Sequence, residues 1–184
     1  TSTGSGVAWE DASGGATDIN GLSDAKTFGT SSIMLGDATT GTIDGANYNT
    51  GLGVDVFAAL TSGDGNVAVG FKSLTGTTTG SNNTAVGDGA GYRITTGADN
   101  TVIGNMEDSG VGAMTSSSNT FVGRSAGESN TSGASNTFIG SLCGDLATTG
   151  AGNTGVGGSS LTALTTAANN TAVGASSMAA NTTG

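Results

Sequence analysis

The chain has 184 residues, of which 35 are glycine and only 4% are aromatic, so few side chains are large enough to fill the broad core of an ordinary globular domain. Its net charge of −10, with Lys26, Lys72, Arg93 and Arg124 scattered along the sequence, excludes an electrostatic grip on nucleic acid or an anionic membrane. No apolar run approaches the roughly 18 residues of a membrane helix, so we expect no membrane insertion.

The first 31 residues carry no copy of the repeat that follows them, and they contain Trp9, the only tryptophan. Residues 1–17 are rich in glycine and serine. The end of a stacked β-structure exposes unpaired strand edges that need a cover. We therefore predict that residues 1–31 form a cap or a junction to an upstream shaft.

Residues 32–184 form a repeat array built on the pentad Asn-Thr-x-Val-Gly, which is spelled out at residues 83–87, 153–157 and 170–174. Successive copies start 17 residues apart, except for one interval of 19. The asparagines that open the copies are Asn49, Asn66, Asn83, Asn100, Asn119, Asn136, Asn153 and Asn170. A ninth copy opens with Ser32, and the last stops two residues short of a full period at Gly184, so we expect the natural protein to continue.

Two positions of the repeat hardly vary. The fifth is glycine in all nine copies, namely Gly36, Gly53, Gly70, Gly87, Gly104, Gly123, Gly140, Gly157 and Gly174. The fourth is always Leu, Ile or Val, and from the third copy onward it is Val69, Val86, Ile103, Val122, Ile139, Val156 and Val173. The eighth is mostly small, and positions thirteen to fifteen commonly read Thr-Thr-Gly. Each repeat therefore predicts a short strand, a glycine corner, a second short segment and a polar return.

A unit of 17 residues is too short for a pair of helices, and its β-branched residues beside glycine favour strands. Units of this size match one coil of a solenoid, so we predict an all-β fold, a parallel β-solenoid (β-roll) of about nine coils. Equivalent residues would then lie about 4.8 Å apart. We expect the asparagines to pass amide hydrogen bonds from coil to coil, the fifth-position glycines to turn a corner at positive φ, and the fourth-position aliphatics to fill the coil.

Both the third and the fourth positions are usually apolar, as in Val102-Ile103 and Phe121-Val122. Neighbouring residues of a strand face opposite ways, so a single coil can hide only one of the two. The other should form an apolar stripe along the rod, and such stripes mark interfaces. We therefore expect a homo-oligomeric fibre, with Val122, Val156 and Phe138 in contact between chains.

The pentad resembles the Asn-Ser/Thr-x-Ala/Val-x-Gly type of motif in the heads of trimeric autotransporter adhesins. With its Thr-Thr-Gly spacers it is also similar to arrays in phage tail fibres, and residues 18–27 are similar to the segment that leads into such arrays. The resemblance covers residues 32–184, although the repeat is longer than the usual adhesin unit of about 14 residues.

The resemblance implies a structural or adhesive segment of a homotrimeric fibre, with left-handed β-rolls intertwined or side by side. It places the protein outside the cell, on a virion tail appendage involved in host attachment or, alternatively, in the head of a bacterial surface adhesin. The partners it implies are further copies of the chain and a host cell-surface glycan or protein.

No catalytic, cofactor or metal site is predicted. The chain has no histidine, so the common general base is missing. Cys143 occupies the small eighth position and is interpreted as a buried packing residue. Glu107 and Asp108 fall in the 19-residue repeat and are interpreted as solvated loop charges. The aspartates form no ladder of the kind that binds calcium in solenoids, although a divalent ion between chains stays open.

Threonine recurs at the thirteenth position, and regular threonine on a flat solenoid face is also how several ice-binding proteins present themselves. Threonine equally suits an exposed strand or turn, and no Thr-x-Thr pair repeats. Ice binding therefore remains a second alternative. The residues in question are Thr61, Thr78, Thr95, Thr131, Thr148, Thr165 and Thr182.

Overall fold

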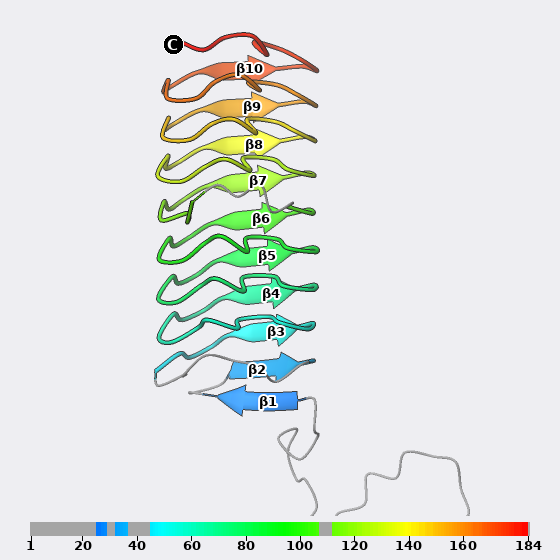
Figure 1. The fold of residues 1–184 in the computed structure, drawn as a ribbon, viewed down its shortest axis with the longest axis vertical. Helices are drawn as coiled ribbons and strands as arrows, with labels where there is room; N and C mark the ends of the chain where they lie inside the picture. The colour runs from blue at the N-terminus through cyan, green and yellow to red at the C-terminus, as the bar shows by residue number, and fades with distance from the viewer. Residues whose placement is uncertain (1–24, 29–31, 37–44, 107–111, 184) are drawn as a thin grey trace, which may run out of the picture.

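The computed structural model describes residues 25–28, 32–36, 45–106 and 112–183, and these form a rod of stacked coils (Figure 1). One short strand from each coil pairs with the strand of the next coil, so that sequence order and sheet order coincide. Nine of the described strands run parallel in one sheet, and the described residues contain no helix. The predicted all-β parallel solenoid is confirmed.

The sheet contains ten strands within the described residues. In order they are β1 (Ala25–Phe28), β2 (Ser32–Leu35), β3 (Thr50–Leu52), β4 (Val67–Val69), β5 (Thr84–Val86), β6 (Thr101–Ile103), β7 (Thr120–Val122), β8 (Thr137–Ile139), β9 (Thr154–Val156) and β10 (Thr171–Val173). The register places like over like, with Thr84 opposite Thr101 and Val86 opposite Ile103. Because the repeat and the register agree, every strand position forms a row along the rod.

Strand β1 differs from the others because it runs antiparallel to β2, with Ala25 opposite Leu35 and Phe28 opposite Ser32. It lies along the edge of β2 opposite to β3, which is the edge that a cap must cover. The other residues of the predicted cap or junction, 1–24 and 29–31 with Trp9 among them, lie outside the described residues.

The alternation of side chains along the strands corrects one prediction. We name each coil after its opening asparagine and count positions from it. In the Asn83 coil, Asn83 and Ala85 are fully buried, whereas Val86 is 38% exposed. Positions one and three share the inner face because a strand alternates with a period of two. The prediction that the fourth position fills the coil is therefore wrong, and the third position fills it.

The core is a narrow column to which positions three and nine both contribute. The Phe121 and Phe138 rings, at position three of adjacent coils, stack with centroids 5.5 Å apart. Position nine of these coils is glycine, and a Cβ on Gly127 would lie 2.7 Å from the Phe121 ring. In several coils where position three is small, as at Ala68, position nine carries a large side chain, as at Leu74. The two positions thus share the core volume in most coils, although both are small in the Asn83 coil.

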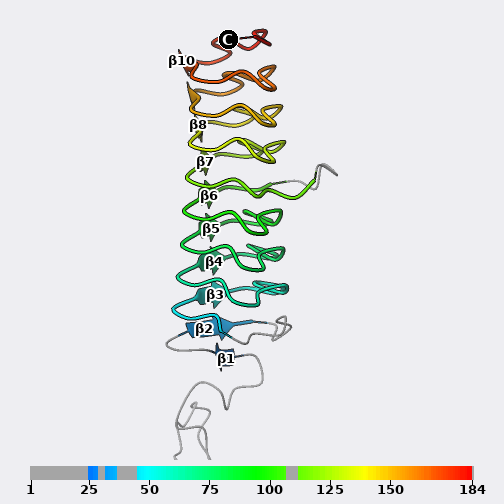
Figure 2. The same cartoon turned by 90° about the vertical axis from the view of Figure 1, so that its left-hand side faces the viewer.

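In most of the described coils the part opposite the strand, positions six to twelve, consists largely of turns, and we call it the turn segment. In these coils its seventh and ninth residues adopt positive φ even when they are not glycine, as in Lys72 (55°) and Leu74 (49°). Figure 2 shows the strands along one side of the rod and the turn segments along the other. The tight coil is therefore a strand closed by left-handed turns.

Candidate functional site

The asparagines that open the coils form a continuous internal ladder. Asn83 is fully buried, and its Oδ1 accepts hydrogen bonds from the backbone N–H and the Nδ2 of Asn100, both at 3.0 Å. Its Nδ2 donates to Oδ1 of Asn66 at 3.1 Å and to the carbonyl of Gly97, in its own coil, at 2.9 Å. The Asn83 carboxamide thus links three coils and ties the strand to the return of its own coil, so a polar group that is costly to bury is fully satisfied.

The same backbone-to-Oδ1 bond recurs along the rod, with donor and acceptor 2.9 or 3.0 Å apart. It joins Asn49 to Asn66, Asn66 to Asn83, Asn83 to Asn100, Asn100 to Asn119, Asn119 to Asn136, Asn136 to Asn153 and Asn153 to Asn170. At the first coil the Ser32 hydroxyl takes over, because its Oγ accepts from the Asn49 N–H at 2.9 Å.

The fifth-position glycines turn the corner at the end of each strand. Their φ angles lie between 120° at Gly174 and 139° at Gly53, a region that L side chains rarely adopt. A Cβ on Gly140 would lie 2.6 Å from both the carbonyl carbon and oxygen of Gly157 in the next coil. The corner therefore requires glycine for its backbone angle and for the close approach of the neighbouring coil.

The fourth-position aliphatics form a row on the surface of the sheet. We call positions two and four of the strands the outer face; it carries no charged residue from β2 to β10. Several side chains of the row are clearly exposed, namely Leu35 38%, Leu52 51%, Val86 38%, Ile103 42%, Ile139 39% and Val173 70%. Val69, Val122 and Val156 in the same row are partly exposed. The structure thus places the expected apolar stripe at position four, and Phe138, which we had expected at the interface, is fully buried inside the coil.

The thirteenth-position threonines use their hydroxyls within the rod. Thr61, Thr131 and Thr148 each donate from Oγ1 to the carbonyl of the corresponding threonine of the next coil, at 2.9, 3.2 and 3.1 Å. All three side chains are partly buried. These hydroxyls therefore reinforce the stacking of the return segments.

Cys143 is fully buried at the eighth position. Burial, opposed by a hydrogen bond from the backbone of Ile139 and assisted by the charge of Asp145, raises the pKa of its thiol to about 11. A thiol that stays protonated at neutral pH is a poor nucleophile, which agrees with the packing role expected for this residue.

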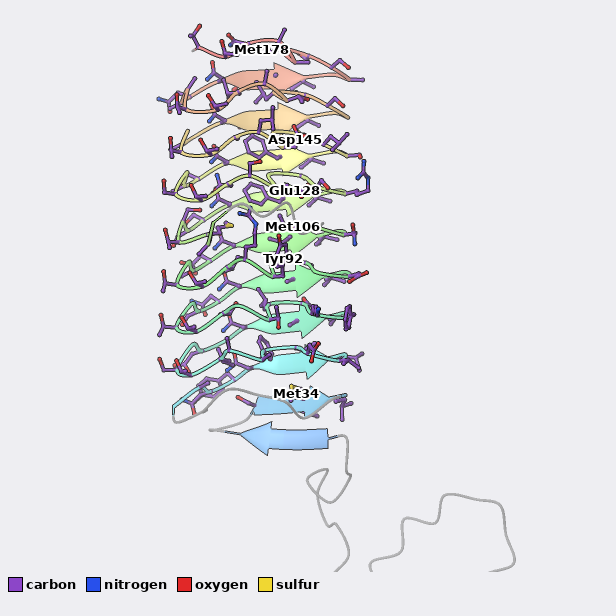
Figure 3. The ribbon with its side chains drawn as sticks, in the orientation of Figure 1. Met34, Tyr92, Met106, Glu128, Asp145 and Met178 are labelled. Carbon is purple, nitrogen blue, oxygen red and sulfur yellow. The ribbon has the colours of Figure 1, made fainter. Side chains whose placement is uncertain are left out.

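Acidic side chains do not gather into a metal site: no group of three potential ligands occurs in the part of the chain that the structure describes. Glu107, Asp108 and Asp37 lie outside that part. Glu128 and Asp145 occupy the same position of adjacent coils, and burial, followed by the charge of Glu128, raises the pKa of Asp145. These two carboxyl groups are visible one above the other in Figure 3.

The turn segments carry a second feature, which the sequence analysis missed. A cleft of about 420 Å³ opens across the turn segments of the Asn66, Asn83 and Asn100 coils. Its lining includes Lys72, Thr75, Asp88, Tyr92, Asn105 and Met106. Two features of the sequence mark this region without predicting the cleft itself: positions six, seven and ten vary from coil to coil, and the only irregular interval of the array begins at Asn100.

Comparison with known proteins finds no matching family model, no similar curated protein and no similar solved structure. No helix in the described part of the chain is long and apolar enough to cross a bilayer. The outer face, the internal ladder and the cleft are thus the features of the described chain that bear on its function.

Proposed function

We propose that this chain is a rod-forming segment of an extracellular structural and adhesive fibre, a phage tail fibre or similar virion appendage that takes part in host attachment. In this proposal three copies pack together through their outer faces. The observation that carries it is the exposed, uncharged row of Leu, Ile and Val at position four, which runs the length of the rod.

The outer face suits self-association because it is repetitive as well as apolar. Removing the remaining exposed area of one such side chain from water contributes about 1 kcal/mol, and the row offers one side chain per coil. A second rod of the same repeat matches this spacing along its whole length, whereas an unrelated globular partner does not. The number of chains, three, follows from the resemblance of the pentad to trimeric adhesin heads and tail fibres.

The head of a bacterial trimeric surface adhesin is the alternative reading of the same rod. It requires the same outer-face contact and the same extracellular location. The two readings differ in the rest of the gene: a downstream trimerisation chaperone would favour the phage appendage, and a membrane-anchor domain would favour the adhesin.

The proposal is tested by placing charge on the outer face. Val122→Asp combined with Val156→Asp should give monomers or aggregate, because two buried carboxylates in each copy would oppose chain packing. The measurement is mass by light scattering after size exclusion. Ser141→Asp, on a turn segment, is the matched control and should leave a trimer.

A monomeric wild-type chain, or an unaltered trimer in the double variant, would contradict the proposal. Phe138→Asp is unsuitable for this test because Phe138 lies inside the coil.

Ice binding remains a second candidate because of a different row of threonines. Position two of the outer face is Thr in most coils, including Thr84, Thr101 and Thr120, and these partly exposed side chains lie opposite one another in register along the sheet. Thermal hysteresis of a monomeric solution would support this candidate. The same face cannot serve both roles, so a stable trimer buried through it argues against ice binding.

A further inference from the structure

The cleft on the turn segments lies at the one place where the repeat is irregular. It spans three successive coils and is formed by positions six, seven and ten. Figure 3 shows Tyr92 and Met106, which belong to this lining, one above the other along the rod. Its volume of about 420 Å³ is within the range of small-molecule sites.

Arg93 shows how the stacking changes next to the cleft. Its side chain is only 7% exposed, and Nη1 donates to the carbonyl of Gly112 at 2.6 Å. Nη2 donates to the carbonyl of Asn130 at 3.3 Å, which lies two coils further along the rod. The Arg93 side chain therefore ties the Asn83 coil both to the longer Asn100 coil and to the Asn119 coil beyond it, next to the cleft.

The polar groups of the cleft combine acceptors with donors. Asp88 offers an exposed carboxylate, which accepts hydrogen bonds, and Lys72 offers an exposed ammonium, which donates them. The Lys72 ammonium lies 5.0 Å from the centre of the Phe71 ring, a cation–π contact that restrains it at the rim. The Asn105 Nδ2 donates to the backbone carbonyl of Asp88 at 3.3 Å, and a carboxamide so held keeps a second N–H and its oxygen.

Tyr92 supplies the apolar surface of the cleft. It is partly exposed and packs against the hydrophobic core, so its ring is held in place from one side. An aromatic ring that is fixed on one face and accessible on another is a platform for an apolar ligand surface, with a polar hydroxyl at its end.

We propose that this cleft binds a neutral saccharide. A sugar ring presents an apolar face that fits against the Tyr92 ring, and hydroxyl groups at its rim that both donate and accept. Those hydroxyls would donate to the Asp88 carboxylate and accept from Lys72 and Asn105. The inference rests on the proposed function, because it names the class of surface ligand that the fibre would touch.

The charges of the described lining favour a neutral ligand. Among the described residues the lining holds one carboxylate, Asp88, and one ammonium, Lys72, so the charges of these two groups offset each other. An acidic sugar or a phosphate would meet Asp88 as well as the field of a chain with net charge −10. A neutral polyol makes use of both side chains without this cost.

The test uses the full chain and saturation-transfer difference NMR, followed by calorimetric titration. The neutral probes are methyl β-D-galactopyranoside, methyl α-D-glucopyranoside and methyl α-D-mannopyranoside; the anionic probes are sialic acid and inorganic phosphate. Asp88→Ala removes the carboxylate, and Tyr92→Leu removes the ring while keeping an apolar side chain against the core. The matched controls are Ser141→Ala, at the position equivalent to Asp88 in a coil remote from the cleft, and Tyr48→Leu, at a tyrosine 63% exposed elsewhere.

We expect at least one neutral glycoside to bind, with affinity weakened about tenfold or more by each cleft variant and unchanged by the controls. Failure of all three neutral probes, binding of anionic probes only, or full affinity in both cleft variants would overturn the inference. Light scattering of the same samples separates this result from the proposed function. A trimer that binds no neutral glycoside would contradict only the saccharide inference, whereas a monomeric wild-type chain would contradict the proposed function.

Discussion

The two sides of each coil obey different rules. On the strand side, positions one to five repeat from coil to coil, and each row makes a hydrogen bond or a packing contact with the next copy of itself. On the turn-segment side, position ten alone reads Thr75, Tyr92, Glu128 and Asp145 in different coils. One side therefore maintains the stack, and the other side is free to vary.

The physical reason is that stacking acts through different groups on the two sides. On the strand side the Asn carboxamide and the missing Cβ of glycine are themselves the contacts, so a substitution affects the next coil directly. On the turn-segment side the contacts between coils are largely backbone bonds, such as Leu74 N–H to the carbonyl of Ala90 at 3.0 Å. The side chains of the turn segments can differ from coil to coil without breaking those backbone bonds. Polar, charged and aromatic side chains can therefore occur on this side of the rod.

The largest effect should come from breaking the strand side at a corner. Gly140→Val places a Cβ 2.6 Å from the Gly157 carbonyl at a φ of 133°. We therefore expect the free energy of unfolding to fall by more than about 4 kcal/mol and the melting transition to lose its cooperativity. Thermal unfolding followed by circular dichroism measures it. Gly112→Val is the control, because no heavy atom lies within 4 Å of its Cβ. Similar melting of the two variants would contradict the requirement for glycine.

A somewhat smaller effect should reveal how the two sides share the core. Phe121→Gly leaves a cavity and should cost about 4 kcal/mol. Adding Gly127→Phe should recover about 2 kcal/mol of this, because it reproduces the Gly51 and Phe57 pairing of the Asn49 coil, in which Phe57 tolerates a φ of 56°. Gly127→Phe alone should destabilise, since its Cβ would lie 2.7 Å from the Phe121 ring. Additive free energies in this double-mutant cycle would contradict the sharing of volume.

The asparagine ladder gives the next effect in size. Asn83→Leu preserves volume but removes four hydrogen bonds and leaves the Asn100 N–H and the Gly97 carbonyl buried without their partner, so we expect a loss of about 3 kcal/mol. Asn170→Leu is the control at a partly exposed rung, where water can replace the bonds, and should cost less than about 1 kcal/mol. Chemical denaturation measures the free energy of unfolding of both variants. Equal losses in the two would contradict the view that the cost comes from burying unpaired polar groups.

These comparisons also explain how far the sequence predicts the structure. The period and the invariant glycine identified the coil, because stacked coils meet the same neighbours and therefore need the same residue at the same position in every copy. The inward position was misassigned because positions three and four are both apolar, as at Val102 and Ile103, and hydrophobicity alone cannot choose between two faces of a strand. The buried Asn at position one gives the answer, since position three must share its face.

The cleft could not be predicted from the pattern, because it is built from the positions that the pattern leaves free. Lys72, Asp88 and Tyr92 belong to two coils and come together only through stacking. An irregular interval in the repeat indicates that the stack changes at that point, but it does not say which neighbouring side chains become exposed.

The smallest effect should come from Asp145, on the turn-segment side. Burial, followed by the charge of Glu128, raises its pKa above the ordinary value of 3.8, and its Oδ1 is buried with no hydrogen-bond partner among the described residues. A raised folded-state pKa means that the folded chain binds the proton more tightly than the unfolded chain. The stabilisation that Asp145 contributes is therefore present at acid pH, and it is lost as pH rises above 3.8 and through the folded-state pKa.

Asp145→Asn should remove this loss, so its melting temperature should exceed that of the wild type by a small margin at neutral pH and converge with it in acid. Glu128→Gln should recover part of the margin, because it removes the charge that, after burial, raises the pKa of Asp145. Melting curves from about pH 3 to pH 8 measure both variants. A wild type that gains stability relative to Asp145→Asn as pH rises would mean that the carboxylate is stabilised by its surroundings. Even the free side of the coil would then carry a specific contact between neighbouring turns.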